Sequence, residues 1–132
     1  LFVNEYEFEL LQKHTGLSAE DILCHPEFTV ITLGRDGARV HTCREDLHVP
    51  IIDDAPVVDP TGVGDAFRAG FLFAYLRGKS MRLCGEMGTV AAAYCIARNG
   101  TQNHTFTLEE FIAYYRQHFD DQGELDNLSK KE

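Results

Sequence analysis

The stretch "VVDPTGVGDAFRAGF", residues 57 to 71, decides how the rest of the chain is interpreted. Two valines lead into Asp-Pro, two glycines flank Val63, and Asp65 stands directly before an apolar helical pattern. A helix N-terminus presents unpaired N–H groups and the positive end of the helix dipole, and glycine lets an anion approach them closely. The stretch is therefore a candidate anion-binding turn between a strand and a helix.

Asp65 is the unusual member of this turn. A carboxylate repels an anion beside it, so a site for anion binding alone gains nothing from it. A phosphoryl-transfer enzyme needs a base for the proton of the attacking hydroxyl, while N–H groups stabilise the transferred group. The alternative is that Asp65 only favours the helix start through the dipole, and the local sequence leaves both interpretations open. Neither a Walker A loop nor a G-x-G-x-x-G fingerprint is present.

Composition limits the class of protein. The chain has 132 residues, 44% of them hydrophobic, which suffices for one globular domain with a core. Its formal net charge of −9, without a basic stripe, argues against binding to nucleic acid or to an anionic membrane. No apolar run approaches the length of about 18 residues that a transmembrane helix needs. The four cysteines form no C-x-x-C pair, which favours a reduced, cytoplasmic chain without structural zinc.

Helix and strand signals alternate along the chain, which predicts an α/β layered domain. Asn4 is expected to cap a helix that ends at Gly16. The apolar face of that helix is predicted to comprise Tyr6, Leu10 and Leu11.

The later helices and strands are predicted from the same kinds of sequence signal. A β-branched run at 28–34 is typical of a strand buried on both faces. The predicted strands cover residues 1–3, 28–34, 38–43, 46–52 and 55–59. The predicted later helices start at Ser18, run over 64–76 and 81–98, and cover 107–119 behind a Thr107–Glu110 capping box. Four or five strands are few for a complete doubly wound sheet, so we expect part of a larger fold.

Four segments together resemble a known family. "DPTGVGDAFRAGF", residues 59 to 71, is similar to the D-[TP]-x-G-[AV]-G-D-x-F-x-x-G signature of the ribokinase/PfkB carbohydrate kinases. "NEYE" at 4–7, "TLGRDG" at 32–37 and "AAAYCIARNGTQ" at 91–102 resemble further family elements in the same order. Within the family, the amino-acid sequence of this signature is most like that of bacterial adenosine kinases.

The resemblance implies a ribokinase-like layered sheet with flanking helices. Residues 1–119 would be the C-terminal nucleotide-binding and catalytic portion of that domain, and residues 120–132 a polar tail. The missing N-terminal half of such a domain normally supplies most substrate contacts. This chain alone is therefore expected to be inactive, and to self-associate or to bind the missing half.

The resemblance also implies roles for individual residues. Asp65 would be the catalytic base, and the backbone N–H groups of the turn would form the anion hole for the phosphoryl group. The residues of that anion hole are Gly62, Val63, Gly64 and Asp65. The nucleotide would be contacted by Asn4, Glu7, Thr32, Gly34, Thr89 and Gly100. Asn4 and Glu7 would help to place Mg²⁺ and the phosphates, Glu7 through water, although the local sequence by itself favours a helix cap and a surface acid.

A monovalent cation is implied as well. Asp59 and Thr61 match the positions that hold such an ion, K⁺ above all, in many members of the family. The alternative for Asp59 is ordinary turn chemistry beside Pro60. Several relatives carry a small hydroxyl residue where this chain has Asn103-His104, which leaves potassium dependence open.

The activity that the resemblance implies is ATP-dependent phosphorylation of a hydroxyl on a small molecule. A nucleoside is the first candidate substrate, with adenosine favoured. A sugar kinase of the ribokinase or fructokinase type is the second candidate. A nucleotide-binding remnant without turnover is the third, although the intact Asp65 favours a catalyst.

Overall fold

The computed structural model describes residues 1–52, 63–97, 108–120 and 122–123. These residues belong to two compact units, Leu1–Ile51 and Ile52–Glu132, which we call the N-terminal and C-terminal units. The predicted strand at 55–59 and the predicted capping box at Thr107 lie outside the described residues. In the part of the chain that the structure describes, no helix has both the length and the apolar character needed to cross a bilayer.

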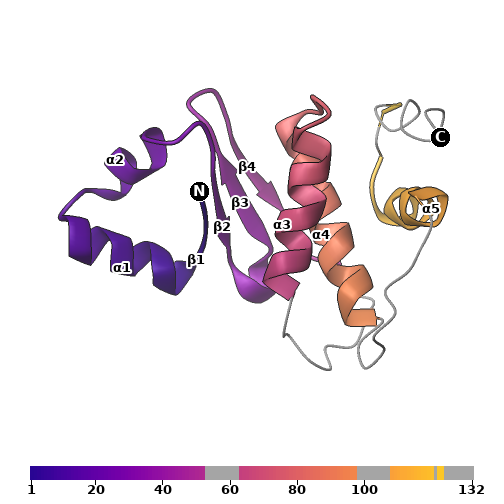
Figure 1. The fold of residues 1–132 in the computed structure, drawn as a ribbon, viewed down its shortest axis with the longest axis horizontal. Coiled ribbons are helices and arrows are strands. Elements are labelled where there is room, and N and C mark those ends of the chain that lie inside the picture. Colours follow the sequence, from indigo (N-terminus) through magenta and orange to yellow (C-terminus); the bar gives the residue numbers. More distant parts are fainter. Residues whose placement is uncertain (53–62, 98–107, 121, 124–132) are drawn as a thin grey trace. The chain divides into compact units, whose positions relative to one another are not determined.

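The N-terminal unit is a mixed four-stranded sheet with the strand order β1-β2-β3-β4 (Figure 1). β1 pairs with β2 in parallel, and the remaining pairs are antiparallel. Two helices form the crossover between the parallel strands and lie on one side of the sheet (Figure 1). The elements in chain order are β1 (Phe2–Asn4), α1 (Glu5–Thr15), α2 (Ala19–Cys24), β2 (Thr29–Thr32), β3 (Ala38–His41) and β4 (Asp46–Val49).

Local signals at the ends of α1 act as predicted. The Asn4 side chain accepts a hydrogen bond from the Glu7 backbone at 2.8 Å, and the Glu7 carboxylate accepts one from the Asn4 backbone at 2.9 Å. At the other end Gly16 adopts a left-handed φ of 73°, a conformation that costs glycine little. The predicted apolar face is wrong in one place, because Tyr6 is 69% exposed and Phe8 is the buried residue.

The core of this unit lies between the two helices and the sheet. Phe8, Ile22, Leu23 and Ile31 are buried in one cluster contributed by α1, α2 and β2. Burying such a side chain stabilises the fold by about 1.5–3 kcal/mol. The cluster therefore explains why two short helices, one of them capped by Ser18 through a 3.2 Å bond from the Asp21 N–H, stay on the sheet.

The two strands predicted at 38–43 and 46–52 are present, shortened to β3 and β4, and they form a hairpin. β3 and β4 pair in the antiparallel direction, and Arg39 forms a bidentate ion pair with Asp46 across them, at 2.8 and 2.6 Å. The Arg39 guanidinium, chiefly through these hydrogen bonds, holds the pKa of the Asp46 carboxyl below its usual value.

The C-terminal unit is built on a helical hairpin. α3 (Val63–Tyr75) and α4 (Met81–Ala97) run side by side, joined by residues 76–80 (Figure 1). The contact is close because it is lined by glycine. A Cβ added at Gly70 would lie 2.6 Å from the Met87 carbonyl oxygen, and one at Gly88 would lie 3.0 Å from the Phe67 ring. One glycine on each helix thus permits the close approach of α3 and α4.

A third helix, α5 (Leu108–His118), is linked to α4 by a buried polar network. Tyr115 is fully buried and donates its hydroxyl to Glu86 at 2.6 Å. Arg82 donates to both oxygens of the same carboxylate, at 2.9 and 2.8 Å. The Glu86 carboxylate is therefore both paired and hydrogen-bonded, as a buried carboxylate must be.

Candidate functional site

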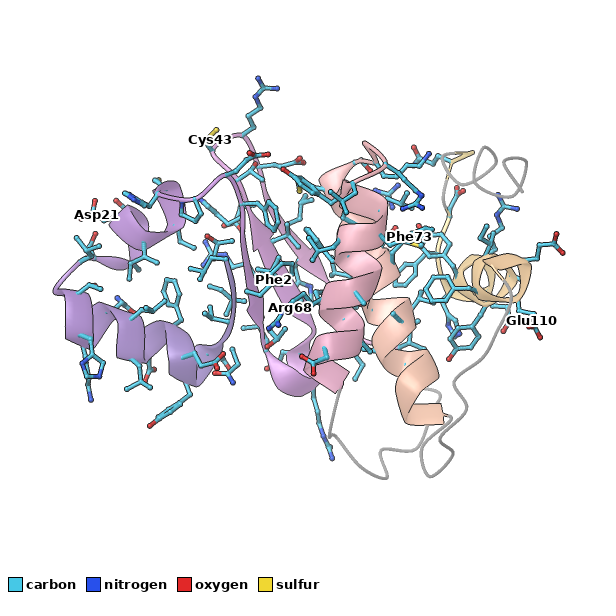
Figure 2. All side chains as sticks on the ribbon, in the orientation of Figure 1. Phe2, Asp21, Cys43, Arg68, Phe73 and Glu110 are labelled. Carbon is cyan, nitrogen blue, oxygen red and sulfur yellow. The ribbon has the colours of Figure 1, made fainter. Side chains whose placement is uncertain are left out.

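Asp65 lies in the first turn of α3 with its side chain 85% exposed. Arg68, labelled in Figure 2, lies one turn later on the same helix. Its Nη1 is 3.8 Å from Asp65 Oδ1. At this distance the two groups attract each other without a hydrogen bond. The carboxylate is thus open to a substrate hydroxyl, as a candidate base must be.

The backbone around Asp65 has the features of an anion-binding turn. α3 begins at Val63, so the N–H groups of Val63, Gly64 and Asp65 belong to the first turn, which has no carbonyl partners within the helix. A Cβ added at Gly64 would meet no atom within 4 Å. The space next to this backbone is therefore open for a ligand, and Gly62, the other predicted member, lies outside the described residues.

In the N-terminal unit the predicted nucleotide residues gather at one edge of the sheet. Asn4 and Thr32 end the parallel strands β1 and β2 and are paired in register. Gly34 follows two residues later, in a short 3₁₀ turn over Gly34–Asp36 with a φ of 61° at Gly34. In α/β sheets ligands bind outside the carboxyl ends of parallel strands. The register thus brings Asn4, Thr32 and Gly34 to the edge where a nucleotide is expected.

Asn4 and Glu7 form the capping box described above, so the structural alternative for this pair is confirmed. A role toward Mg²⁺ stays a prediction, and the chemistry of the pair is compatible with it. Glu7 is exposed, and it accepts the hydrogen bond from the Asn4 N–H with one of its two carboxylate oxygens, Oε1. Mg²⁺ keeps several waters and is usually held by one or two carboxylates plus phosphates. Glu7 therefore fits a water-mediated contact better than direct enclosure of the ion.

Of the remaining predicted site residues, one is buried and three lie outside the described residues. Thr89 lies in α4 and is only 6% exposed, so it belongs to the interior of the C-terminal unit. Gly100, Asp59 and Thr61 lie outside the described residues, and their roles stay predictions. Among the residues that the structure covers, no group of three or more His, Cys, Asp or Glu side chains could hold a metal ion.

One contact at the nucleotide edge has no signal in the sequence. The Nε2 atom of His48 in β4 is hydrogen-bonded to the backbone carbonyl of Asp36, in the turn that follows β2. Twelve residues separate the two, and only the pairing of β3 with β4 brings them together. No local motif indicates such a contact, because strand register has to be known first.

The family of the chain follows from comparison of its sequence with family models. Residues 1–107 match the pfkB family of carbohydrate kinases. The chain belongs to that family. The family that the sequence motifs indicated is thereby confirmed.

Relatives of this pfkB family chain include both nucleoside and sugar kinases. A nucleoside kinase of Methanocaldococcus jannaschii is 31% identical over 118 residues, which are 89% of this chain and 39% of that protein. An uncharacterized sugar kinase of Archaeoglobus fulgidus is 40% identical over 101 residues, covering 75% of this chain and 40% of the relative. The chain thus spans about two fifths of the length of these relatives.

Solved structures confirm the ribokinase-like fold. The Burkholderia thailandensis nucleoside kinase in complex with inosine matches with a TM-score of 0.84 and 32% identity, over 89% of this chain and 40% of that one. The crystal structure of the M. jannaschii nucleoside kinase, described as an archaeal member of the ribokinase family, matches with a TM-score of 0.80. The mixed sheet and flanking helices of this chain are therefore a portion of that fold.

Proposed function

We propose that this chain is part of a kinase that transfers the terminal phosphoryl group of ATP to a hydroxyl of a nucleoside, with adenosine as the first candidate. The single observation that supports this best is the exposed Asp65 carboxylate in the first turn of α3, behind an open glycine backbone, in a member of the pfkB family. The nucleoside kinases among its relatives, one of them solved with inosine and one complex solved with ADP-inosine, support the substrate class.

The proposed step divides the chemistry between a side chain and the backbone. Asp65 accepts the proton of the substrate hydroxyl as its oxygen forms a bond to the γ-phosphorus. The bond between that phosphorus and the bridging oxygen breaks, and ADP leaves with the electron pair. The N–H groups of Val63, Gly64 and Asp65 stabilise the charge on the transferred group, together with that of Gly62.

Asn4, Thr32 and Gly34 are proposed to contact the nucleotide, and Gly100 and the neighbourhood of Thr89 are proposed to border its adenine. Bound Mg²⁺ would neutralise charge on the phosphates, and Glu7 would contact its water shell. Asp59 and Thr61 are proposed to hold a monovalent cation such as K⁺. The proposed partners are a small-molecule substrate, ATP and these ions, and the proposed location of the kinase is the cytoplasm.

A sugar kinase is the second candidate, because the relatives include an uncharacterized sugar kinase and a ribokinase is among the similar structures. The substrate contacts that separate the two classes are expected in the part of the relatives that this chain does not span. A nucleotide-binding protein without turnover is the third candidate, and it differs from both by the absence of product.

The test is a phosphorylation assay on the full-length gene product, with ATP and a panel of nucleosides and sugars. Asp65→Asn is expected to lower kcat by about 10²–10⁴-fold, the usual contribution of a general base. Nucleotide affinity and thermal stability should change little, because the side chain is exposed. Arg68→Gln is the matched control on the same helix face, expected to have the smaller effect on kcat. Wild-type turnover in Asp65→Asn would refute the base assignment, and nucleotide binding without any product would favour the third candidate.

A further inference from the structure

We propose that His48 is a positioning residue for the nucleotide: it fixes the turn at residues 32–37 from the neighbouring strand and so sets the affinity for ATP. This inference rests on the proposed function, because the turn is assigned to the nucleotide there. The segment, "TLGRDG", is called the nucleotide turn below.

The nucleotide turn is closed by its own backbone. The Leu33 N–H donates to the Gly37 carbonyl at 2.8 Å, and the Asp36 N–H donates back to the Leu33 carbonyl at 3.1 Å. The Gly37 N–H donates to the Gly34 carbonyl at 3.2 Å. Gly34 and Gly37 have φ values of 61° and 93°, which side-chain-bearing residues rarely adopt. The turn has a defined shape, and this shape depends on its two glycines.

β4 holds the turn from outside through its backbone. A Cβ added at Gly37 would lie 2.1 Å from the Val49 carbonyl oxygen, so the turn and the strand meet without room for a side chain. The pairing of Ala38 with Val49 puts this contact at the first position of the hairpin ladder. Figure 2 shows Cys43 at the hairpin tip, at the other end of β3 and β4 from the nucleotide turn. The turn is thus attached to the base of the hairpin.

His48 adds a side-chain contact at the same place. It pairs with Arg39 in the ladder, one position along from Val49, and its Nε2 is hydrogen-bonded to the Asp36 carbonyl oxygen. A carbonyl oxygen only accepts, so Nε2 carries the hydrogen and donates. The neutral Nε2–H tautomer and the imidazolium both provide this donor. The contact restrains the Asp36 carbonyl, which lies between the two glycines and accepts none of the backbone hydrogen bonds named above.

The expected consequence is pre-organisation of the nucleotide turn. A segment that is ordered before binding loses less conformational entropy when the ligand arrives, which strengthens affinity without a new contact to the ligand. Loss of the His48 bond should therefore weaken ATP binding while the chemical step, at Asp65, proceeds as before once ATP is bound.

The experiment compares His48→Leu, His48→Gln and the control His25→Leu in the full-length gene product. His25 is an exposed histidine of the same unit, at the C-terminus of α2. His48→Leu should raise the KM for ATP about three- to tenfold, the range expected for one hydrogen bond, with kcat and the KM for the phosphoryl acceptor unchanged. His48→Gln should restore the wild-type KM, because its amide N–H₂ reaches about as far as Nε2. A general structural role would instead change kcat, both KM values and the melting temperature together.

The following outcomes decide the proposal. An unchanged KM for ATP in His48→Leu, or an equal increase in His48→Gln, would overturn it. If His48→Leu does not fold, His48→Asn replaces it, because its shorter amide does not reach the Asp36 carbonyl. The proposal then requires that the KM for ATP rise in His48→Asn but not in His48→Gln. If the wild-type protein phosphorylates nothing in the panel, the kinase proposal fails. The proposal for His48 is then tested by the Kd of ATP from titration calorimetry, which should rise about three- to tenfold in His48→Leu and stay at the wild-type value in His48→Gln. Absence of ATP binding would overturn both the proposed kinase function and the proposed role of His48.

Discussion

The N-terminal and C-terminal units hold their candidate site residues in different ways. In the N-terminal unit Asn4 and Glu7 bond to each other's backbone, and the nucleotide turn is closed by backbone hydrogen bonds. In the C-terminal unit Asp65 is 85% exposed, and the helix that carries it is fixed by close packing against α4. The nucleotide residues are thus part of what stabilises their unit, whereas the candidate base is not.

This difference separates stability from activity. Substitution of Asn4 is expected to lower stability and ligand binding together, because one side chain serves both. Substitution of the base should affect activity alone. Substitutions in the contact between α3 and α4 should instead lower the stability of the fold. The predictions below test this separation, from the largest expected effect on stability to the smallest.

The largest effect is expected from Gly70→Ala. Its added methyl would lie 2.6 Å from the Met87 carbonyl and 2.8 Å from the Ala91 Cβ, so α3 and α4 must move apart. Overpacking of this kind lowers the free energy of unfolding by about 1–3 kcal/mol. Chemical denaturation of the full-length gene product measures it.

Gly64→Ala is the matched control on the same helix. No atom lies within 4 Å of its added methyl, so stability should stay the same or rise by up to about 1 kcal/mol from better helix propensity. The methyl would stand beside the proposed anion hole, so turnover should fall. Equal stability losses at Gly70 and Gly64 would contradict the packing account.

Asn4→Ala should have an intermediate effect. Loss of an N-cap lowers stability by about 1 kcal/mol, and the same variant should weaken ATP binding. Asn4→Asp keeps the cap and serves as the control for stability. If Asn4→Asp is stable but still binds ATP weakly, the amide itself contacts the nucleotide, and if Asn4→Ala is as stable as the wild type, the cap is unimportant.

The smallest effect concerns pH and the Arg39–Asp46 pair. Because the pKa of Asp46 is lower in the folded chain than in the unfolded one, its stabilisation is present at neutral pH. It is lost as the pH falls below the usual Asp value of about 3.9 and through the lowered pKa. Both side chains are more than a third exposed, so the pair is worth at most about 1 kcal/mol. Asp46→Asn should remove this part of the acid dependence in denaturation curves, and an unaltered acid dependence would contradict it.

The sequence predicted those parts of the fold that have local causes. Asn4, Ser18 and Gly16 end helices where their cap chemistry requires, and the β-branched run around Val30 is a buried strand. The predicted strand at 28–34 proved shorter, Thr29–Thr32, because the chain enters a 3₁₀ turn at Gly34. Glycine in a left-handed conformation ends a strand more sharply than its apolar pattern suggests.

What the sequence did not predict depends on distant partners. Tyr6 and Phe8 are equally apolar by pattern, and only the positions of Ile22 and Ile31 decide that Phe8 is buried. The bond from Tyr115 to Glu86 spans 29 residues, and no motif indicates it. For the candidate site, the family signature located Asp65 and its turn, but the substrate contacts are expected in the part of the relatives that this chain does not span.

The glycine contact between α3 and α4 has a consequence for chimeric proteins. The glycine turn is the obvious cassette to exchange between relatives when a different activity is wanted. Its helix, however, packs on α4 where Gly70 faces Met87 and Gly88 faces Phe67 without room for a side chain. A graft that takes residues 57–71 without the matching face of α4 would bring a foreign residue into this contact and displace the base. The two helices should therefore be transplanted as one cassette, with the crossover points placed before the turn and after α4.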